Sequence, residues 1–258
     1  MDAFAQRPSV LALPAVYVPD RSICLDINVK LGLKGNSFVF SREIDNEARA
    51  RIFAGVIKKR ISLFDAIGTY RRIGIDEIAS LSLISEFIKP RVHLNFKDLL
   101  ETHRKVMAAC GSRDCRKVGL RRQEVLVGVN SASFSGFVAP PRSNLKPDME
   151  WLIHHILHDV NNFLGFACVF FWFFLHSHPF VDGNGRTSRA FFLRAVRSKW
   201  PDSIVFFDGA LLFLEGLESK KDEFIHFMSF SRSGGLESFL NFMGEVLVAA
   251  GWTMVSES

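Results

Sequence analysis

Residues 163–175 read FLGFACVFFWFFL, and residues 178–189, almost directly after them, read HPFVDGNGRTSR. An α-helix made of the first stretch spans only about 20 Å, whereas the hydrocarbon core of a bilayer is about 30 Å thick. The first stretch therefore predicts a buried core helix rather than a transmembrane helix. The second stretch predicts a polar loop directly after that helix. The helix and the loop together decide the fold and the position of the site.

The composition favours one large globular domain, or one domain with an appendage. The chain has 258 residues, and it contains 26 Phe but only 2 Tyr. Phe buries a large apolar surface without a polar group, so this bias predicts a core of Phe-rich helices.

Cysteine usage and the N-terminal residues predict a cytoplasmic protein, acting in its own cell or delivered into another. Four cysteines are few for this length, and Cys168 lies inside the apolar stretch, which is typical of reduced, buried thiols. Residues 1–20 lack a cationic start and contain three prolines, so we expect no signal peptide.

The charge of the chain is mildly positive. The formal net charge is +5, and Lys and Arg occur in short, scattered clusters. The sequence has no zinc finger, RNA-binding signature or basic arm, so we do not expect nucleic-acid binding. Such a surplus suits nucleotide phosphates or an acidic partner equally well.

Hydrophobic spacing predicts an all-α fold, a helical bundle with a small β-hairpin flap. We expect an N-terminal arm at 1–40, a helical region at 41–95, and a compact core with C-terminal helices at 96–258. Residues 24–33 alternate in polarity and predict an extended segment, and residues 117–129 predict the hairpin. The proline-rich residues 139–147 predict an irregular connection. Helices are expected at 44–64, 75–88, 96–107, 148–160 and 163–175, from the polar loop to 200, and again at 235–252.

The polar loop has the features of an anion site at the start of a helix. Gly183 and Gly185 permit a tight backbone path around Asn184. The first amide groups of a helix have no partner inside it, and the helix dipole adds about half a positive charge there. Arg186 and Arg189 share one face and lean towards the same end, which favours a polyphosphate over a carboxylate.

The remaining loop residues suggest catalysis. Asp182 precedes the anion site, and a carboxylate beside bound phosphates is suited to recruit Mg²⁺. The ordinary pKa of a histidine suits removal of a hydroxyl proton at neutral pH, which makes His178 a candidate base, and Phe180 between the two residues is expected to anchor the loop. Each residue alone also fits an ordinary surface loop. Together they favour attack of a hydroxyl group on a nucleoside polyphosphate.

The stretch HPFVDGNGRTSR resembles the motif of the Fic family, His-Pro-Phe-x-Asp-Gly-Asn-Gly-Arg-x-x-Arg, at every defined position. The similarity extends more loosely over residues 96–200. It implies an all-α fold and transfer of AMP from ATP to a Ser, Thr or Tyr hydroxyl of a protein. It also implies that His178 is the general base and that Asp182 binds Mg²⁺. Gly183, Asn184, Gly185, Arg186 and Arg189 would then bind the phosphates.

Two further segments are implied by the resemblance. A flap that holds the target by strand-like pairing falls near Leu126, Val127 and Gly128. Many Fic proteins also carry an inhibitory Ser/Thr-x-x-x-Glu-Gly/Asn motif, whose glutamate pairs with the second arginine of the loop. Residues 41–46 read SREIDN, with Ser41 in place and Asp45 where glutamate is expected. Glu43 or Glu47 could fill the same role, and the alternative is that Ser41 caps a helix whose first turn favours acidic residues.

Other interpretations remain open from sequence. Some Fic relatives transfer another phosphate-containing group or remove AMP, and a catalytically inactive module would use the loop to sense nucleotide. Self-modification and oligomers are compatible with the sequence. His154 and His158 have a metal-ligand spacing, but they lack the glutamate of a zinc protease, which favours a solvent-exposed helix face.

Overall fold

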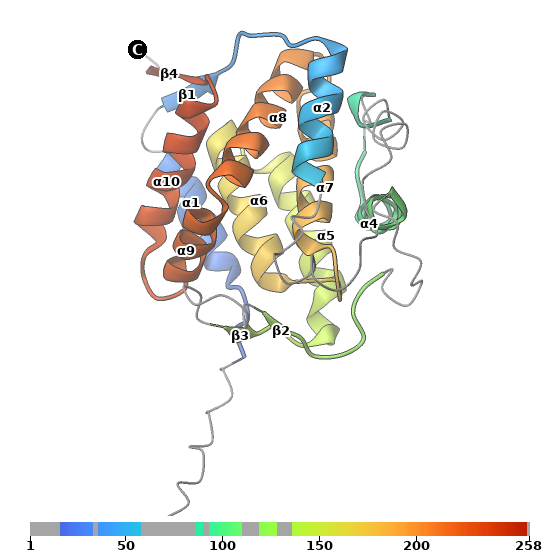
Figure 1. The fold of residues 1–258 in the computed structure, drawn as a ribbon. Helices are drawn as coiled ribbons and strands as arrows, with labels where there is room; N and C mark the ends of the chain where they lie inside the picture. The colour runs from blue at the N-terminus through green and yellow to red at the C-terminus, as the bar shows by residue number, and fades with distance from the viewer. Residues whose placement is uncertain are drawn as a thin grey trace, which may run out of the picture.

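A computed structural model shows a helical bundle with two small antiparallel sheets (Figure 1). It describes residues 16–32, 36–57, 86–89, 93–109, 119–127 and 136–256. The described elements are α1 (Arg21–Gly32), β1 (Asn36–Val39), α2 (Asn46–Ile57), α4 (Phe96–Ala109), β2 (Leu126–Val127), β3 (Phe137–Val138), α5 (Arg142–His158), α6 (Phe163–Ser177), α7 (Asn184–Lys199), α8 (Ile204–Ser219), α9 (Lys221–Ser231), α10 (Leu236–Ala249) and β4 (Thr253–Ser256).

Helix α6 is the centre of the bundle. It packs against α1, α5, α7 and α10, and every one of its side chains except Leu175 is buried. A helix that is apolar on all sides must be surrounded in this way. The prediction of a buried core helix at 163–175 is therefore confirmed, and no helix in the described ranges is long and apolar enough to span a bilayer.

Helix α7 connects the polar loop to the rest of the molecule. It packs against α4 on one side and against α2 and α8 on the other. The side chain of Asn162 caps the start of α6 by accepting a hydrogen bond from Gly165 N at 2.6 Å. Because α6 and α7 are both fixed in the core, the loop between them is held at both ends.

The two small sheets lie at opposite ends of the bundle (Figure 1). Strand β2 pairs with β3, so the expected hairpin exists, but its second strand lies at Phe137 and Val138 rather than within 117–129. Strand β1 pairs with β4, which sequence spacing did not predict. The flap candidate Gly128 lies outside the described residues.

The expectation of an extended segment at 24–33 is wrong. These residues form most of α1, because Cys24, Ile27 and Leu31 recur at helical spacing and are buried against α6. The alternating polarity was coincidental, since Leu25 and Val29 are exposed. The domain boundaries at residues 40 and 95 stay predictions.

The irregular connection at 139–147 is also wrong in part. Helix α5 begins at Arg142 and includes Pro147, whose missing N–H removes one backbone hydrogen bond of the helix. The helix at 96–107 is confirmed by α4. Of the helix expected at 75–88, only 86–88 fall in the described ranges. Cys168 is buried as expected.

Candidate active site

The polar loop begins and ends on a residue with left-handed backbone. His178, the C-cap of α6, has φ 45°, and Gly183, the N-cap of α7, has φ 78°. In the described ranges, His178 is the one residue other than glycine with positive φ. Such a conformation costs about 1–3 kcal/mol for a non-glycine residue, so surrounding contacts must maintain it.

The predicted anion site lies at the start of α7. The first backbone hydrogen bond joins Thr187 N to Gly183 O at 2.8 Å, so the preceding amides have no partner inside the helix. A Cβ atom on Gly183 would lie 2.6 Å from the Met107 sulfur, and one on Gly185 would lie 3.4 Å from Arg189 Nη1. The second distance places the Arg189 guanidinium over the first turn, where an anion would bind.

The side chain of Asn184 holds the loop together. It accepts a hydrogen bond from Phe180 N at 3.0 Å and donates one to Phe180 O at 2.8 Å. The amide group is thus used to close the loop on itself. The backbone N–H of Asn184, in the first turn of α7, is the donor that the predicted phosphate contact would use.

Asp182 lies at the centre of the loop and contacts Arg186. Its Oδ1 accepts hydrogen bonds from Gly183 N at 2.6 Å and from Arg186 Nη2 at 3.2 Å. No cluster of three or more metal-ligating side chains occurs in the part of the chain that the structure describes. Any cation at Asp182 would therefore take most of its ligands from water and bound phosphate.

His178 is an uncharged base in this environment. Burial lowers the pKa of its imidazole to about 4, and the nearby Arg121 charge acts in the same direction. A hydrogen bond to the Leu175 carbonyl and the Asp182 charge partly oppose this shift. The imidazole is therefore neutral at neutral pH and able to accept a proton.

An apolar cavity of about 270 Å³ opens beside His178. Its walls include Val127 of β2, Phe224 and Ile225 of α9, and the first turn of α7 at Gly185. The structure thus brings a predicted flap residue, the candidate base and the anion site to one place. A larger groove of about 640 Å³ lies between α1, α10 and β4 and contains none of these residues.

Helix α4 packs against the loop and the first turn of α7 through His103. His103 is fully buried, bonds through Nδ1 to Thr187 Oγ1 at 2.9 Å, and stacks on the Phe180 ring with centroids 3.8 Å apart. Phe180 is therefore buried, as expected of an anchor, but its stacking partner comes from α4. Sequence spacing carried no signal for His103, because its neighbours in space are more than 70 residues away in the chain.

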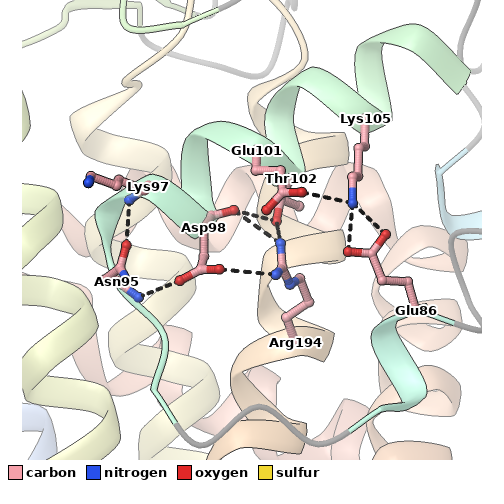
Figure 2. Close-up of polar contacts among 8 residues, drawn as sticks. All are labelled: Glu86, Asn95, Lys97, Asp98, Glu101, Thr102, Lys105 and Arg194. Carbon is pink, nitrogen blue, oxygen red and sulfur yellow. Dashed lines mark hydrogen bonds and ion pairs between the residues drawn. The ribbon is translucent and has the colours of Figure 1, made fainter.

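A polar network fixes α4 against α7 (Figure 2). Arg194 donates from Nη1 to Asp98 O at 3.1 Å and to Thr102 Oγ1 at 2.6 Å, and its Nη2 contacts Asp98 Oδ1 at 3.2 Å. Nearby, Lys105 Nζ pairs with Glu86 at 2.6 Å and with Glu101 at 2.9 Å. The network secures the helix that carries His103 and Met107.

The predicted inhibitory pairing between Asp45 and Arg189 is not present. Asp45 Oδ1 accepts a hydrogen bond from Ala48 N at 2.7 Å and so caps the start of α2. Arg189 instead donates from Nε to the carbonyl of Val56 near the other end of α2, about 16 Å away along the helix. Helix α2 is thus capped by Asp45 and not by Ser41, the residue that the capping alternative named. Ser41, Glu43 and Glu47 are exposed.

The histidine pair on α5 lies apart from the loop. His154 and His158 are exposed, with ring centroids 4.6 Å apart, and line a different cavity from His178. They contribute nothing to the loop chemistry described above.

Comparisons with known proteins agree with the loop geometry. The model of the Fic/DOC family matches residues 93–195, which run from just before α4 into α7. A protein adenylyltransferase Fic of Drosophila erecta is 29% identical over 183 residues, and that of Drosophila melanogaster is 28% identical. Each alignment covers 66% of this chain but only 32% of the relative, so the chain spans about a third of their length.

A solved structure shares the fold. The crystal structure of a Fic family protein from Desulfovibrio desulfuricans G20 superposes with a TM-score of 0.59 over 92% of this chain and 74% of that chain. The two sequences are 17% identical, so this likeness concerns the fold alone.

Proposed function

We propose, because this chain is a Fic domain protein, that it transfers AMP from ATP to a side-chain hydroxyl of a protein. The observation that carries the proposal is the meeting of a neutral imidazole, a helix start with two arginines, and an apolar cavity. Named relatives are adenylyltransferases, which agrees with this chemistry.

The reaction begins with proton transfer to His178. As the hydroxyl oxygen of the target attacks the α-phosphorus, its proton moves to the unprotonated imidazole nitrogen. The bond between the α-phosphorus and the bridging oxygen then breaks, and that oxygen leaves with pyrophosphate. A base that is neutral at neutral pH can accept this proton without first losing one.

The start of α7 stabilises the phosphates. The backbone amides at 184–186 donate to phosphate oxygens, and the helix dipole favours their charge. Arg186 and Arg189 flank the same turn and neutralise charge that develops on the leaving pyrophosphate. Positioning and charge neutralisation therefore account for most of the catalysis.

Asp182 is suited to hold Mg²⁺ together with the phosphates. Its carboxylate is part-exposed at the edge of the anion site, and Mg²⁺ commonly takes one or two protein carboxylates and completes its shell with water and phosphate. Bound there, the ion would neutralise phosphate charge. Arg186, now bonded to Asp182, would then turn towards the phosphates.

The apolar cavity is suited to the base of the nucleotide, and β2 is suited to the target. Phe224 and Ile225 offer flat and aliphatic surfaces for an aromatic ring. In the described residues β2 pairs with β3 alone, so its outer edge can add a strand of the target protein. Leu126 on that strand is 42% exposed.

Incubation with labelled ATP and Mg²⁺ tests the proposal. Label on the α-phosphate should enter protein with wild type and not with His178→Ala, whereas label on the γ-phosphate should not enter protein at all. His154→Ala, which removes an exposed histidine outside the loop, is the matched control and should behave as wild type. Label in the chain itself would report self-modification. Transfer of γ-label, or α-label transfer by His178→Ala, would refute the proposal.

A further inference from the structure

Arg121 is a buried arginine in the segment that leads into β2. It is only 1% exposed, and its guanidinium donates to backbone carbonyls of three segments. Nε bonds to His178 O at 2.9 Å, Nη1 to Gln123 O at 3.1 Å, and Nη2 to Pro140 O and, at 3.4 Å, to Ser177 O. One side chain thus joins the flap, the segment after β3 and the end of α6.

The backbone of the same segment makes a second connection. Arg121 N donates to Pro179 O at 3.0 Å, and Leu120 forms an antiparallel bridge with Phe180. Residues 120–121 therefore follow the loop from Ser177 to Phe180, on both sides of the candidate base.

The conformation of His178 needs such support. Its φ of 45° is unfavourable for a residue with a Cβ atom, and the last carbonyls of α6 have no partners inside the helix. A buried guanidinium supplies donors to these carbonyls and places a positive charge at the negative end of the helix dipole. Helix capping and maintenance of the left-handed backbone are thus performed by one residue.

We propose that Arg121 is a positioning residue for His178 and that it couples the flap to the base. By holding the carbonyl of His178 it keeps the backbone left-handed, which directs the imidazole into the cavity beside Val127. The inference rests on the proposed function only where it treats His178 as the base. A target strand that shifts the flap would therefore also shift His178.

Electrostatics support the same arrangement. The charged groups that act on the His178 imidazole are Arg121, which disfavours protonation, and Asp182, which favours it. Loss of the Arg121 charge should therefore make His178 easier to protonate, in addition to releasing its backbone.

The test compares Arg121→Met with Arg197→Met. Arg197 is also a buried arginine that donates to a backbone carbonyl, Ile88 O at 2.7 Å. Burial lowers the pKa of both arginines. It lies near the far end of α7, away from the loop. Both variants should lose stability, so the comparison separates a general loss of packing from an effect on His178.

For Arg121→Met we expect kcat to fall about 10- to 100-fold while the Kd for ATP changes less than about twofold. The NMR titration of the His178 ring proton should move to higher pH. Arg121→Lys, which keeps the charge but loses the fork of donors, should lie between this variant and wild type. Arg197→Met should keep the wild-type kcat per folded molecule and the wild-type titration.

Equal losses of kcat in the two methionine variants, or an unchanged His178 titration in Arg121→Met, would overturn the inference. If Arg121→Met does not fold, Arg121→Lys is judged by the same two readouts. If the wild type itself transfers no label, the proposed function has failed, but the titration still decides the role of Arg121.

Discussion

Arg189 and Glu218 form an ion pair between α7 and α8, with Arg189 Nη1 3.4 Å from Glu218 Oε2. The two side chains are only 18% and 17% exposed. The carboxylate beside the second loop arginine therefore comes from a helix that follows the loop in sequence, and not from Asp45. Because phosphate and Glu218 are both anions, a phosphate at the predicted site would compete with Glu218 for the Arg189 guanidinium.

Glu218→Gln should raise the affinity for ATP. Partly exposed ion pairs contribute about 0.2–1 kcal/mol, so the Kd should fall by a factor of roughly 1.4 to 5. Calorimetric titration with ATP and Mg²⁺ measures this change. Glu215→Gln, a substitution of another α8 glutamate that is exposed, is the control. A Kd that stays the same or rises in Glu218→Gln would show that the pair does not compete with nucleotide.

Asp45→Ala should lower stability without raising activity. The substitution removes the cap of α2, which costs about 1 kcal/mol, while Arg189 keeps its contacts. Asp45→Ser retains a capping oxygen and should restore most of the stability. Urea unfolding and self-labelling with ATP measure the two effects. Increased labelling in both variants would instead support an inhibitory role for Asp45.

Gly183→Ala should abolish nucleotide binding. Alanine there is strained at φ 78°, and its Cβ would meet the Met107 sulfur at 2.6 Å, so the start of α7 must shift. Gly234→Ala is matched in strain, with φ 102°, but has nothing within 4 Å of the added atom and lies outside the loop. Both should lose about 1–3 kcal/mol of stability. ATP binding that survives in Gly183→Ala would argue against the anion site.

Asp98→Ala should destabilise the protein far more than Asp148→Ala. Arg194 is buried and would lose its carboxylate partner, which costs about 3–5 kcal/mol. Arg21, the partner of Asp148, is 45% exposed, so loss of this ion pair in Asp148→Ala should cost no more than about 1 kcal/mol. Urea unfolding compares the two. Similar losses would mean that the network of Figure 2 does not secure α4.

Stability should fall as the pH drops from about 6.5 towards 4. Burial lowers the pKa of His178 to about 4 and that of His176 to about 3, while both histidines in the unfolded chain keep the ordinary value of 6.5. Below about pH 6.5 the unfolded state therefore binds more protons, and the free energy of unfolding declines. His176→Gln should weaken this dependence. A wild-type urea midpoint that is constant across the window would contradict these shifts.

The loop and the central helix were predictable because their signals are local. A fully apolar run of helical length must be buried, and the glycines at 183 and 185 already indicated that a helix starts within the loop. The role of the Asn184 side chain was not predictable, because its hydrogen bonds to Phe180 depend on the path of the loop.

Contacts between segments that are distant in the chain could not be predicted from the spacing of residues. Arg121 and Arg122 look alike as neighbours in a basic stretch, yet only Arg121 is buried. His103 and Glu218 reach the loop through the packing of α4 and α8, which no periodicity encodes. The segment at 24–33 was misread because a short stretch can satisfy both a two-residue and a helical period.

The pairing of β1 with β4 has a consequence for biosynthesis. Trp252, just before β4, is buried against Phe163 and Phe40 and donates to Gly209 O at 3.1 Å. At about 5–20 residues per second, a ribosome needs roughly 10–40 s to progress from β1 to β4. During that interval the edge of β1 and the apolar surface around Phe40 stay uncovered. The nascent chain should therefore bind chaperones that recognise apolar segments until Trp252 has been made.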